Sequence, residues 1–451
     1  MPGITRNAAA RRAPPDWLAR LAAAPQSPLY LALADALGAA VEAGELRPGD
    51  RLPAQRAVAA ALGADLSTVT RGFAQARARG LLAGEAGRGT FVRAVQGPAV
   101  DHSMNLPPPI GASMRDALSE GMAAVLRRAD PATLMTYRTG PSPRERTAAA
   151  GWLAPALGPI ATERLFLAPG AQSAITALLA LLAQPGGALL VEPLAYPGLL
   201  AAARAQKLAL IPIVCDAEGF LPDAFESACR AHAPALAYCT PTLQNPTGAT
   251  ASLARRKALV AAARKHDATI IEDDAYGPLD PEAAPLAALA PERVYHIATL
   301  SKALAPGLRT AFLTAPIGAD FAAVAGALRA TSLTTAPLLA ELAVEWIESG
   351  LARHICAVIR RESAARMKLA KAALPQALGG PHGFHLWLDL PVGWTPHAFA
   401  AAAVGSSVAV TPGKHFLADP NQEMRGVRLG LGAAPDRQQL AQGLAALARF
   451  L

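Results

Sequence analysis

From about residue 113 onward, short apolar runs alternate along the chain with longer stretches in which apolar residues recur at helical spacing. Apolar runs of roughly four to eight residues, bounded by Gly, Pro or Asp, are typical of buried β-strands. Strands that alternate with helices form a mostly parallel sheet that carries helices on both faces. The sequence therefore predicts an α/β body, with strands expected in 164–170, 188–193, 208–214, 235–241, 268–276, 294–300 and 309–315.

The pattern changes again from about Glu341. A long helical stretch comes first, and two β-rich runs follow it at 383–390 and 427–432. This order predicts a smaller α+β lobe over about 341–451 at the C-terminal end of the body.

The N-terminal part of the chain follows a different pattern. Leu29, Leu33, Leu37 and Val41 recur at every fourth position, which places them on one helix face. A second helix is expected from Pro53 to about residue 62 and a third from about residue 67, and two short strands around a glycine-rich tip follow at 81–92. A helix, a helix-turn-helix and a hairpin in this order predict a mainly α winged helix-turn-helix.

Composition marks the boundary between these two parts. Residues 94–113 contain four prolines and almost no apolar period. They read as a linker that joins two separate bodies. We therefore expect a basic leader over 1–27, the winged helix-turn-helix domain over 28–93, a linker over 94–112 and the body over 113–451.

Charge is spread unevenly over the chain. The net charge is +8, and residues 1–95 hold 12 arginines against 7 acidic residues. A concentrated positive field suits nucleic acid, although a basic terminus also serves as a solubilising tail. The chain offers no apolar run long enough for a transmembrane helix and no secretory signal, and its four cysteines lack metal-type spacing. We expect a cytoplasmic protein without metal or membrane attachment.

The chemistry of the N-terminal domain fits DNA. The third helix can enter the major groove with its first residues on base edges, while arginines before it bind phosphates and the hairpin tip reaches the minor groove. A small helical protein-interaction domain is the alternative on pattern alone. The expected DNA contacts are Arg51, Arg56, Ser67, Thr68, Thr70, Arg71 and Arg88.

The segments "LRPGDRLPAQRAVAAALG", "STVTRGF" and "GRGTFV" resemble the DNA-binding domain of the GntR family of bacterial regulators. The resemblance covers about residues 28–92 and implies DNA binding. Members of that family usually carry Ser-Arg before this third helix, whereas this chain has Asp65 and Leu66. One base-reading arginine is therefore absent from its usual place.

In the body, the segment "TLSKALAPGLRT" contains Lys302, one of only seven lysines beside 35 arginines. Alone, such a residue reads as a surface lysine in a loop. Its neighbours Thr299, Ser301 and Arg309 can together bind a phosphate, and a buried lysine can react with an aldehyde. A phosphate that carries an aldehyde is pyridoxal phosphate.

Pyridoxal phosphate has further requirements, and the strand ends of the body offer a residue for each of them. An acid keeps its ring nitrogen protonated, hydrogen-bond donors hold its ring oxygen, a helix N-terminus holds its phosphate, and an aromatic ring stacks on its face. The candidates are Asp273 for the nitrogen, Asn245 and Tyr276 for the oxygen, Gly170, Ala171 and Gln172 for the phosphate, and Tyr196 for stacking.

The segments "NPTG", "DDAY", "SKALAPGLR" and "RGVRLGLG" resemble fold-type I pyridoxal-phosphate enzymes, the class I and II aminotransferases, over about residues 113–451. The resemblance implies that Lys302 forms the Schiff base, that Asp273 pairs with the ring nitrogen and that Asn245 and Tyr276 bind the ring oxygen. It assigns Arg309, Thr299, Ser301 and Ala171 to the phosphate. Arg428, with Asn245, would bind a substrate carboxylate, and Tyr137 would reach the phosphate of a neighbouring subunit.

A GntR-type domain followed by an aminotransferase-like body resembles the MocR family of transcription regulators. The resemblance implies a cytosolic head-to-tail homodimer that binds paired half-sites on operator DNA and senses an amino acid, an amine or pyridoxal phosphate. Because the catalytic residues look complete, the alternative is a working aminotransferase that transfers an amino group between an amino acid and a 2-oxo acid.

Overall fold

The structure, a computed structural model, describes residues 17–18, 21, 28–42, 45–47, 49–78, 81–85, 89–92 and 100–451. The chain divides into two compact units, Met1–Pro98 and Ala99–Leu451. Among the described residues, no helix is both long and apolar enough to cross a membrane.

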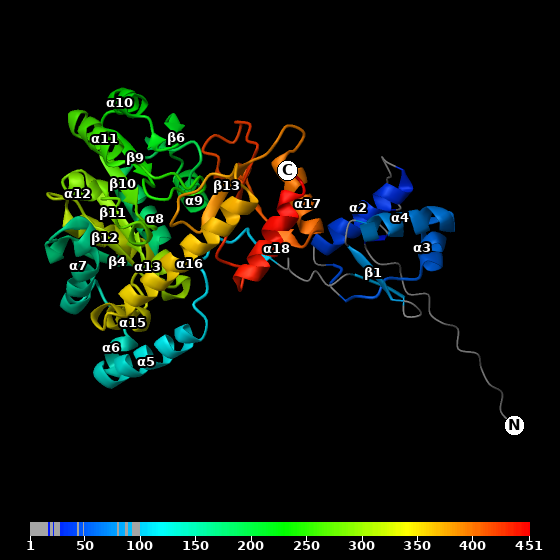
Figure 1. Ribbon diagram of the computed structural model, residues 1–451, viewed down its shortest axis with the longest axis horizontal. Coiled ribbons are helices and arrows are strands. Elements are labelled where there is room, and N and C mark those ends of the chain that lie inside the picture. Colours follow the sequence, from blue (N-terminus) through cyan, green and yellow to red (C-terminus); the bar gives the residue numbers. More distant parts are fainter. Residues whose placement is uncertain are drawn as a thin grey trace. The chain divides into compact units, whose positions relative to one another are not determined.

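The first unit is the expected winged helix-turn-helix (Figure 1). Its described elements are α2 (Leu29–Glu42), α3 (Gln55–Leu62), α4 (Leu66–Ala78) and the antiparallel strands β1 (Leu82–Glu85) and β2 (Gly89–Val92). Gly63 ends α3 in the left-handed conformation, with φ of 61°, which glycine adopts without strain. Leu33, Leu37, Val69 and Phe73 are buried and form the core between α2 and α4.

The second unit is built on a seven-stranded sheet in the order β4-β12-β11-β10-β9-β5-β6. All neighbouring strands in it are parallel except β12, which is antiparallel to both β11 and β4. The strands are β4 (Leu165–Ala168), β5 (Ala188–Val191), β6 (Ala209–Pro212), β9 (Leu236–Cys239), β10 (Thr269–Asp273), β11 (Val294–Thr299) and β12 (Ala311–Thr314). Each of the seven expected runs therefore contains a strand.

Helices cover both faces of this sheet because successive strand residues point to opposite sides (Figure 1). Leu189 and Val191 pack on one face, whereas Leu190 packs on the other. The first face carries α8 (Ala171–Leu182), α9 (Pro197–Ala205) and α14 (Phe321–Ser332), and the second carries α10 (Pro222–Ala231), α11 (Leu253–Lys265) and α12 (Leu286–Leu289). The small hairpin of β7 (Cys215–Asp216) and β8 (Gly219–Phe220) leads into α10.

Four more helices belong to the large lobe of this unit. They are α5 (Ala112–Arg128), α6 (Pro131–Leu134), α7 (Pro143–Leu157) and α15 (Pro337–Glu348). The short helix α13 (Leu300–Ala303) and the 3-10 turns η1 (Thr162–Arg164), η2 (Gly277–Leu279) and η3 (Pro306–Leu308) connect its strands.

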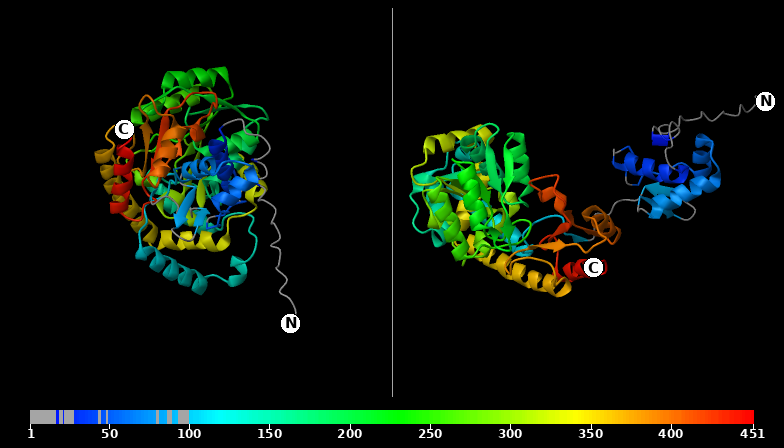
Figure 2. Two further views of the ribbon diagram at one scale, coloured as in Figure 1. Left: turned by 90° about the vertical axis from the view of Figure 1, so that its right-hand side faces the viewer. Right: turned by 90° about the horizontal axis from the view of Figure 1, so that it is seen from above.

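The small lobe lies at one end of the large lobe, coloured orange to red in Figure 2. It holds the three-stranded sheet β13-β16-β15 and the helices that pack on it. Its elements are α16 (Leu351–Ala373), β13 (His385–Asp389), α17 (Pro396–Gly405), β14 (Val408–Ala409), β15 (Thr411–Pro412), η4 (Gly413–Phe416), β16 (Gly426–Gly430) and α18 (Arg437–Ala448).

Two expectations about boundaries need correction. The single long helix expected from about Glu341 is two helices, because Gly350 takes the left-handed conformation between α15 and α16. The linker expected over 94–112 is too long at its C-terminal end. Val100 and Asp101 form β3, which pairs in parallel with β14, so these two residues are part of the small lobe.

Candidate functional site

A cavity of about 320 Å³ lies at the carboxyl ends of the central strands. In an open α/β sheet, this edge is where ligands bind. The cavity brings together eleven of the thirteen residues that the sequence predicted for the cofactor and the substrate: Ala171, Gln172, Tyr196, Asn245, Asp273, Tyr276, Thr299, Ser301, Lys302, Arg309 and Arg428.

Lys302 lies on α13, which begins directly after β11, so the end of the strand holds it in the cavity. Thr299 caps this helix by accepting a hydrogen bond from the Ser301 amide at 3.2 Å. Burial, aided by the nearby Arg428 cation, lowers the pKa of Lys302 from 10.5 to about 8. A larger share of this amine is therefore uncharged at neutral pH, which is the form that attacks a carbonyl carbon.

Asp273 ends β10 on the floor of the cavity and is 5% exposed. Burial raises the pKa of its carboxyl group to about 6, while the hydroxyl group of Tyr238, which donates to Oδ2 at 2.6 Å, works against that rise. Its other oxygen, Oδ1, is buried without a hydrogen-bond partner in the described structure. A buried acceptor of this kind needs a donor, and a protonated ring nitrogen supplies one.

The N-terminus of α8 and Arg309 form a candidate phosphate cradle. Gly170 precedes the helix with φ of 92°, and a Cβ atom there would lie 2.6 Å from Nη2 of Arg309. Only glycine therefore lets the arginine approach the first turn, whose free amides include those of Ala171 and Gln172. Arg309 itself adopts the left-handed conformation and donates to the carbonyl of Pro169.

Arg428 comes from β16 of the small lobe and points across to the large lobe. Its Nη1 donates to Oδ1 of Asn245 at 3.2 Å, and its Nη2 donates to the carbonyl of Ser103. Because the amide oxygen of Asn245 is used by Arg428, the amide nitrogen is the atom left to donate to a ligand. Nε of Arg428 is buried without a partner in the described structure, so the guanidinium keeps binding capacity.

Two tyrosines shape the remaining wall. The hydroxyl group of Tyr276 accepts a hydrogen bond from Nδ2 of Asn105 at 2.8 Å, and burial raises the pKa of this phenol. The ring of Tyr196 packs on Gly198, where a Cβ atom would lie 2.5 Å from it. Gln172 is fixed by donating to the carbonyl of Gly198 at 2.9 Å.

Residues 103–106 also line the cavity, although their sequence pattern had indicated a linker. Lys302 Nζ donates to the carbonyl of Asn105 at 2.5 Å, and Thr411 Oγ1 donates to the carbonyl of Ser103 at 2.9 Å. The close approach of β16 requires its glycine, since a Cβ atom at Gly430 would lie 2.2 Å from the carbonyl oxygen of Met104. The sequence analysis also missed Tyr238 as a partner of Asp273. Its place near the end of β9, the strand beside β10, could have indicated a buried hydroxyl group close to Asp273.

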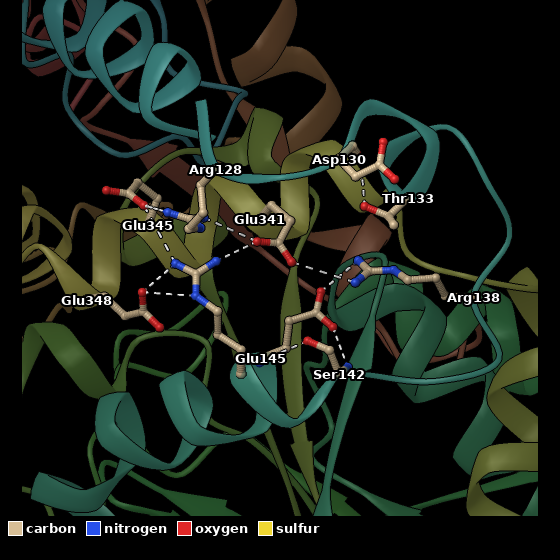
Figure 3. Close-up of polar contacts among 10 residues, drawn as sticks. Arg128, Asp130, Thr133, Arg138, Ser142, Glu145, Glu341, Glu345 and Glu348 are labelled. Carbon is tan, nitrogen blue, oxygen red and sulfur yellow. Dashed lines mark hydrogen bonds and ion pairs between the residues drawn. The ribbon is translucent and has the colours of Figure 1, made fainter. Parts of the chain in front are cut away.

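Tyr137 is the predicted residue that lies apart from the cavity, with 80% of its surface exposed. The segment that carries it is held by an ion-pair network between α5, α7 and α15 (Figure 3). Arg138 pairs with Glu145 at 2.7 Å, and Arg144 pairs with Glu341 at 2.6 Å. The structure therefore does not place Tyr137 in the cavity of its own chain.

The predicted DNA contacts of the first unit lie on α3, on α4 and, for Arg51, beside Phe91 of β2. Ser67, Thr70, Arg71, Arg51 and Arg56 are exposed, and Thr68 is half-buried. Thr70 Oγ1 donates to Oε1 of Gln55 at 2.9 Å, which ties α4 to α3. The guanidinium of Arg71 lies 4.3 Å from the centre of the Tyr30 ring, and Arg88 lies outside the described residues.

These cavity residues fit pyridoxal phosphate. The unpartnered Asp273 oxygen suits a ring nitrogen, the Gly170 turn and Arg309 suit a phosphate, and Lys302 suits an aldehyde. The space between the strand ends and Arg428 is left for the rest of a ligand.

Comparison with known proteins agrees with this geometry. Residues 111–447 match the family described as "Aminotransferase class I and II", and residues 29–92 match "Bacterial regulatory proteins, gntR family". The uncharacterized HTH-type transcriptional regulator YdeF of Bacillus subtilis is 30% identical over 94% of this chain and 95% of its own length. The HTH-type transcriptional regulator TauR of Rhodobacter capsulatus is 28% identical over 90% and 93%.

Among solved structures, LysN, an α-aminoadipate aminotransferase of Thermus thermophilus determined with N-(5'-phosphopyridoxyl)-L-leucine, matches 84% of this chain and 98% of its own at 26% identity, with a TM-score of 0.71. The predicted fold-type I body is thereby confirmed. The chain belongs to the class I and II aminotransferase family and, with its gntR-family domain at the N-terminus, has the MocR type of organisation.

Proposed function

We propose that this protein is a pyridoxal-phosphate-dependent transcription regulator whose aminotransferase-like body controls DNA binding by its N-terminal domain. One observation carries the proposal: a basic winged helix-turn-helix and a complete cofactor cavity occur in one chain that aligns almost end to end with HTH-type regulators.

The cofactor, when bound, would supply an aldehyde for amines and an electron sink for the carbon next to the nitrogen. Lys302 would hold it covalently, Asp273 would keep its ring nitrogen protonated, and Asn245 and Tyr276 would hold its ring oxygen. Thr299, Ser301, Arg309 and the first amides of α8 would bind its phosphate. Tyr196 would stack on the ring.

The effector is an amino acid or another amine. Arg428 would bind a carboxylate in a bidentate pair, and a carboxylate is a stronger acceptor than the Ser103 carbonyl that it binds in this structure. The cofactor, when Lys302 holds it, would engage the amino group that donates to the Asn105 carbonyl in this structure.

Both of these contacts lie in residues 100–106, which directly follow the connection to the DNA-binding domain in sequence. Ligand binding would therefore act on the segment through which the chain connects the body to the N-terminal domain. We propose that loss of the Ser103 and Asn105 contacts releases this segment and changes how the domain engages DNA.

Two copies of the chain would suit this role. A head-to-tail homodimer lets Tyr137 reach the phosphate site of the partner, and it presents two reading domains to paired half-sites. The protein would act in the cytoplasm, where bacterial DNA lies.

The test is operator affinity of the full chain, measured by fluorescence anisotropy with and without cofactor and with a panel of amino acids. Lys302→Ala should bind the operator but lose the response to amino acids. Linkage requires that the operator change effector affinity by the same factor, about 5–150-fold. Identical operator affinity in all states of wild type and variant would refute control by the body.

An active aminotransferase is the second candidate. Lys302, whose pKa is lowered, could move a proton beside a bound cofactor, and the unpartnered oxygen of Asp273 could hold its ring nitrogen protonated. Multiple-turnover release of a 2-oxo acid from an amino acid, with no effect of that amino acid on DNA binding, would favour this function over regulation.

A further inference from the structure

A second cavity, of about 270 Å³, lies between α7 and the turn η2 of the large lobe and α16 of the small lobe. Its walls are mostly apolar, and its polar groups fall into two pairs. The wall residues are Trp152, Leu153, Pro155, Ala156, Gly277, Pro278, Pro281, Ala298, Cys356 and Ala357, and the two pairs are Asp274 with His296 and Arg353 with Arg360.

This cavity is separate from the cofactor site but shares its framework. Asp273 lines the cofactor cavity, whereas the next residue, Asp274, lines the second one. The same alternation holds for Thr299 and its neighbour Ala298 on β11. The ends of β10 and β11 therefore form the wall between the two cavities.

Asp274 and His296 lie at the closed end, with exposed fractions of 3% and 1%. Nε2 of His296 lies 3.1 Å from Oδ2 of Asp274. The remaining polar atom of each side chain, Oδ1 and Nδ1, has no hydrogen-bond partner in the described structure. Buried polar atoms are rarely left unsatisfied, so two together in the lining of a cavity indicate a ligand group or water between them.

The open end carries two arginines from α16. Arg353 is exposed, donates to the carbonyl of Gly151 at 2.8 Å and lies 5.9 Å from the centre of the Trp152 ring. Arg360 is half-buried, and within the described residues it has neither a hydrogen bond nor an ion pair. A half-buried guanidinium with free donors suits a carboxylate.

We propose that this cavity is a second ligand site for a small aromatic or alicyclic carboxylate. Arg360 binds the carboxylate at the mouth, Trp152 and the prolines contact the ring, and a hydrogen-bonding group at the far end of the ligand meets Asp274 and His296. The site is distinct from the one that binds the cofactor and amino acids.

The test uses the full chain loaded with pyridoxal phosphate and three probes: 4-hydroxybenzoate, benzoate and phenol. Isothermal titration calorimetry should detect binding of 4-hydroxybenzoate, which has both polar groups, and weaker binding of the other two. Each probe lacks an amine, so none can react with the cofactor.

Arg360→Ala should lower the affinity for 4-hydroxybenzoate at least about tenfold, because one charged hydrogen-bonding partner of the carboxylate is lost. The matched control is Arg361→Ala, which removes the neighbouring exposed arginine outside the cavity and should change nothing. Ala357→Trp should fill the cavity and abolish binding. An unchanged cofactor spectrum and melting temperature will show that each variant is folded.

Binding that survives both Arg360→Ala and Ala357→Trp would overturn the proposal, as would the absence of binding at millimolar concentrations of all three probes. Binding lost in Arg428→Ala instead would place the probe in the cofactor cavity and would also overturn it. Equal affinity for benzoate and 4-hydroxybenzoate would exclude the contact with Asp274 and His296. None of these outcomes bears on regulation of DNA binding, which is measured separately.

Discussion

Asp273 should destabilise the cofactor-free protein. Burial raises the pKa of its carboxyl group from 3.8 to about 6. The folded protein therefore holds this proton to higher pH than the unfolded chain, and the free energy of unfolding falls as pH rises through this range. The difference between about 6 and 3.8, at about 1.4 kcal/mol for each pH unit, gives a cost of about 3 kcal/mol above pH 7.

The isosteric variant Asp273→Asn removes this cost while its side-chain oxygen can still accept from Tyr238. In the absence of cofactor, we expect the free energy of unfolding of the variant to exceed that of the wild type by about 3 kcal/mol at pH 7.5 and by about half of that at pH 5. With cofactor the order should reverse, because the protonated ring nitrogen needs the carboxylate charge.

Guanidinium-induced unfolding, followed by tryptophan fluorescence, measures the stability difference between variant and wild type at each pH, since four of the five tryptophans lie in the body. Asp223→Asn, which changes an exposed carboxylate on α10, is the control and should stay within about 0.5 kcal/mol of the wild type. A stability difference for Asp273→Asn that is the same at both pH values, or a less stable cofactor-free variant, would refute the reasoning.

The two units carry three further predictions. Borohydride reduction of the cofactor-loaded protein should fix a pyridoxyl group on Lys302, seen by peptide mass spectrometry, and Lys302→Ala should abolish it without unfolding the chain; a group found on another lysine would contradict the assignment. Arg428→Ala should weaken amino acids by about 2–5 kcal/mol in absorbance titrations while simple amines lose little; an equal loss for both would show a structural role. Arg71→Ala should weaken DNA binding and flatten its salt dependence while the cofactor spectrum stays the same, and Arg361→Ala, a surface change in the body, should leave DNA affinity intact; a salt-independent affinity would contradict an electrostatic interface.

The sequence alone determined the features that depend on local pattern. Strands and helices are recognised from residues only a few positions apart, through apolar residues at every second or fourth position and through glycine and proline turns. The seven strands of the large sheet and the helices of the N-terminal domain were therefore predictable. The cofactor residues were predictable for a related reason. Asp273 ends a strand and Lys302 and Asn245 follow strands, and parallel strands bring their carboxyl ends to one edge. Arg309 reaches the same edge because it lies just before β12, which runs antiparallel to its neighbours.

The tertiary structure alone decided what depends on contacts between distant segments. Residues 100–106, which lie between Pro98 and Pro107, have no local apolar period, yet two of their carbonyl groups bind Lys302 and Arg428, which lie about 200 and 325 residues away. Likewise, nothing in the local sequence separates Asp273, which faces the cofactor cavity, from Asp274, which faces the second cavity with His296. Every residue has a backbone carbonyl, and the sequence does not say which face of a strand borders which cavity. Only the packing of the lobes could therefore assign the roles of these carbonyl groups and of the two aspartates.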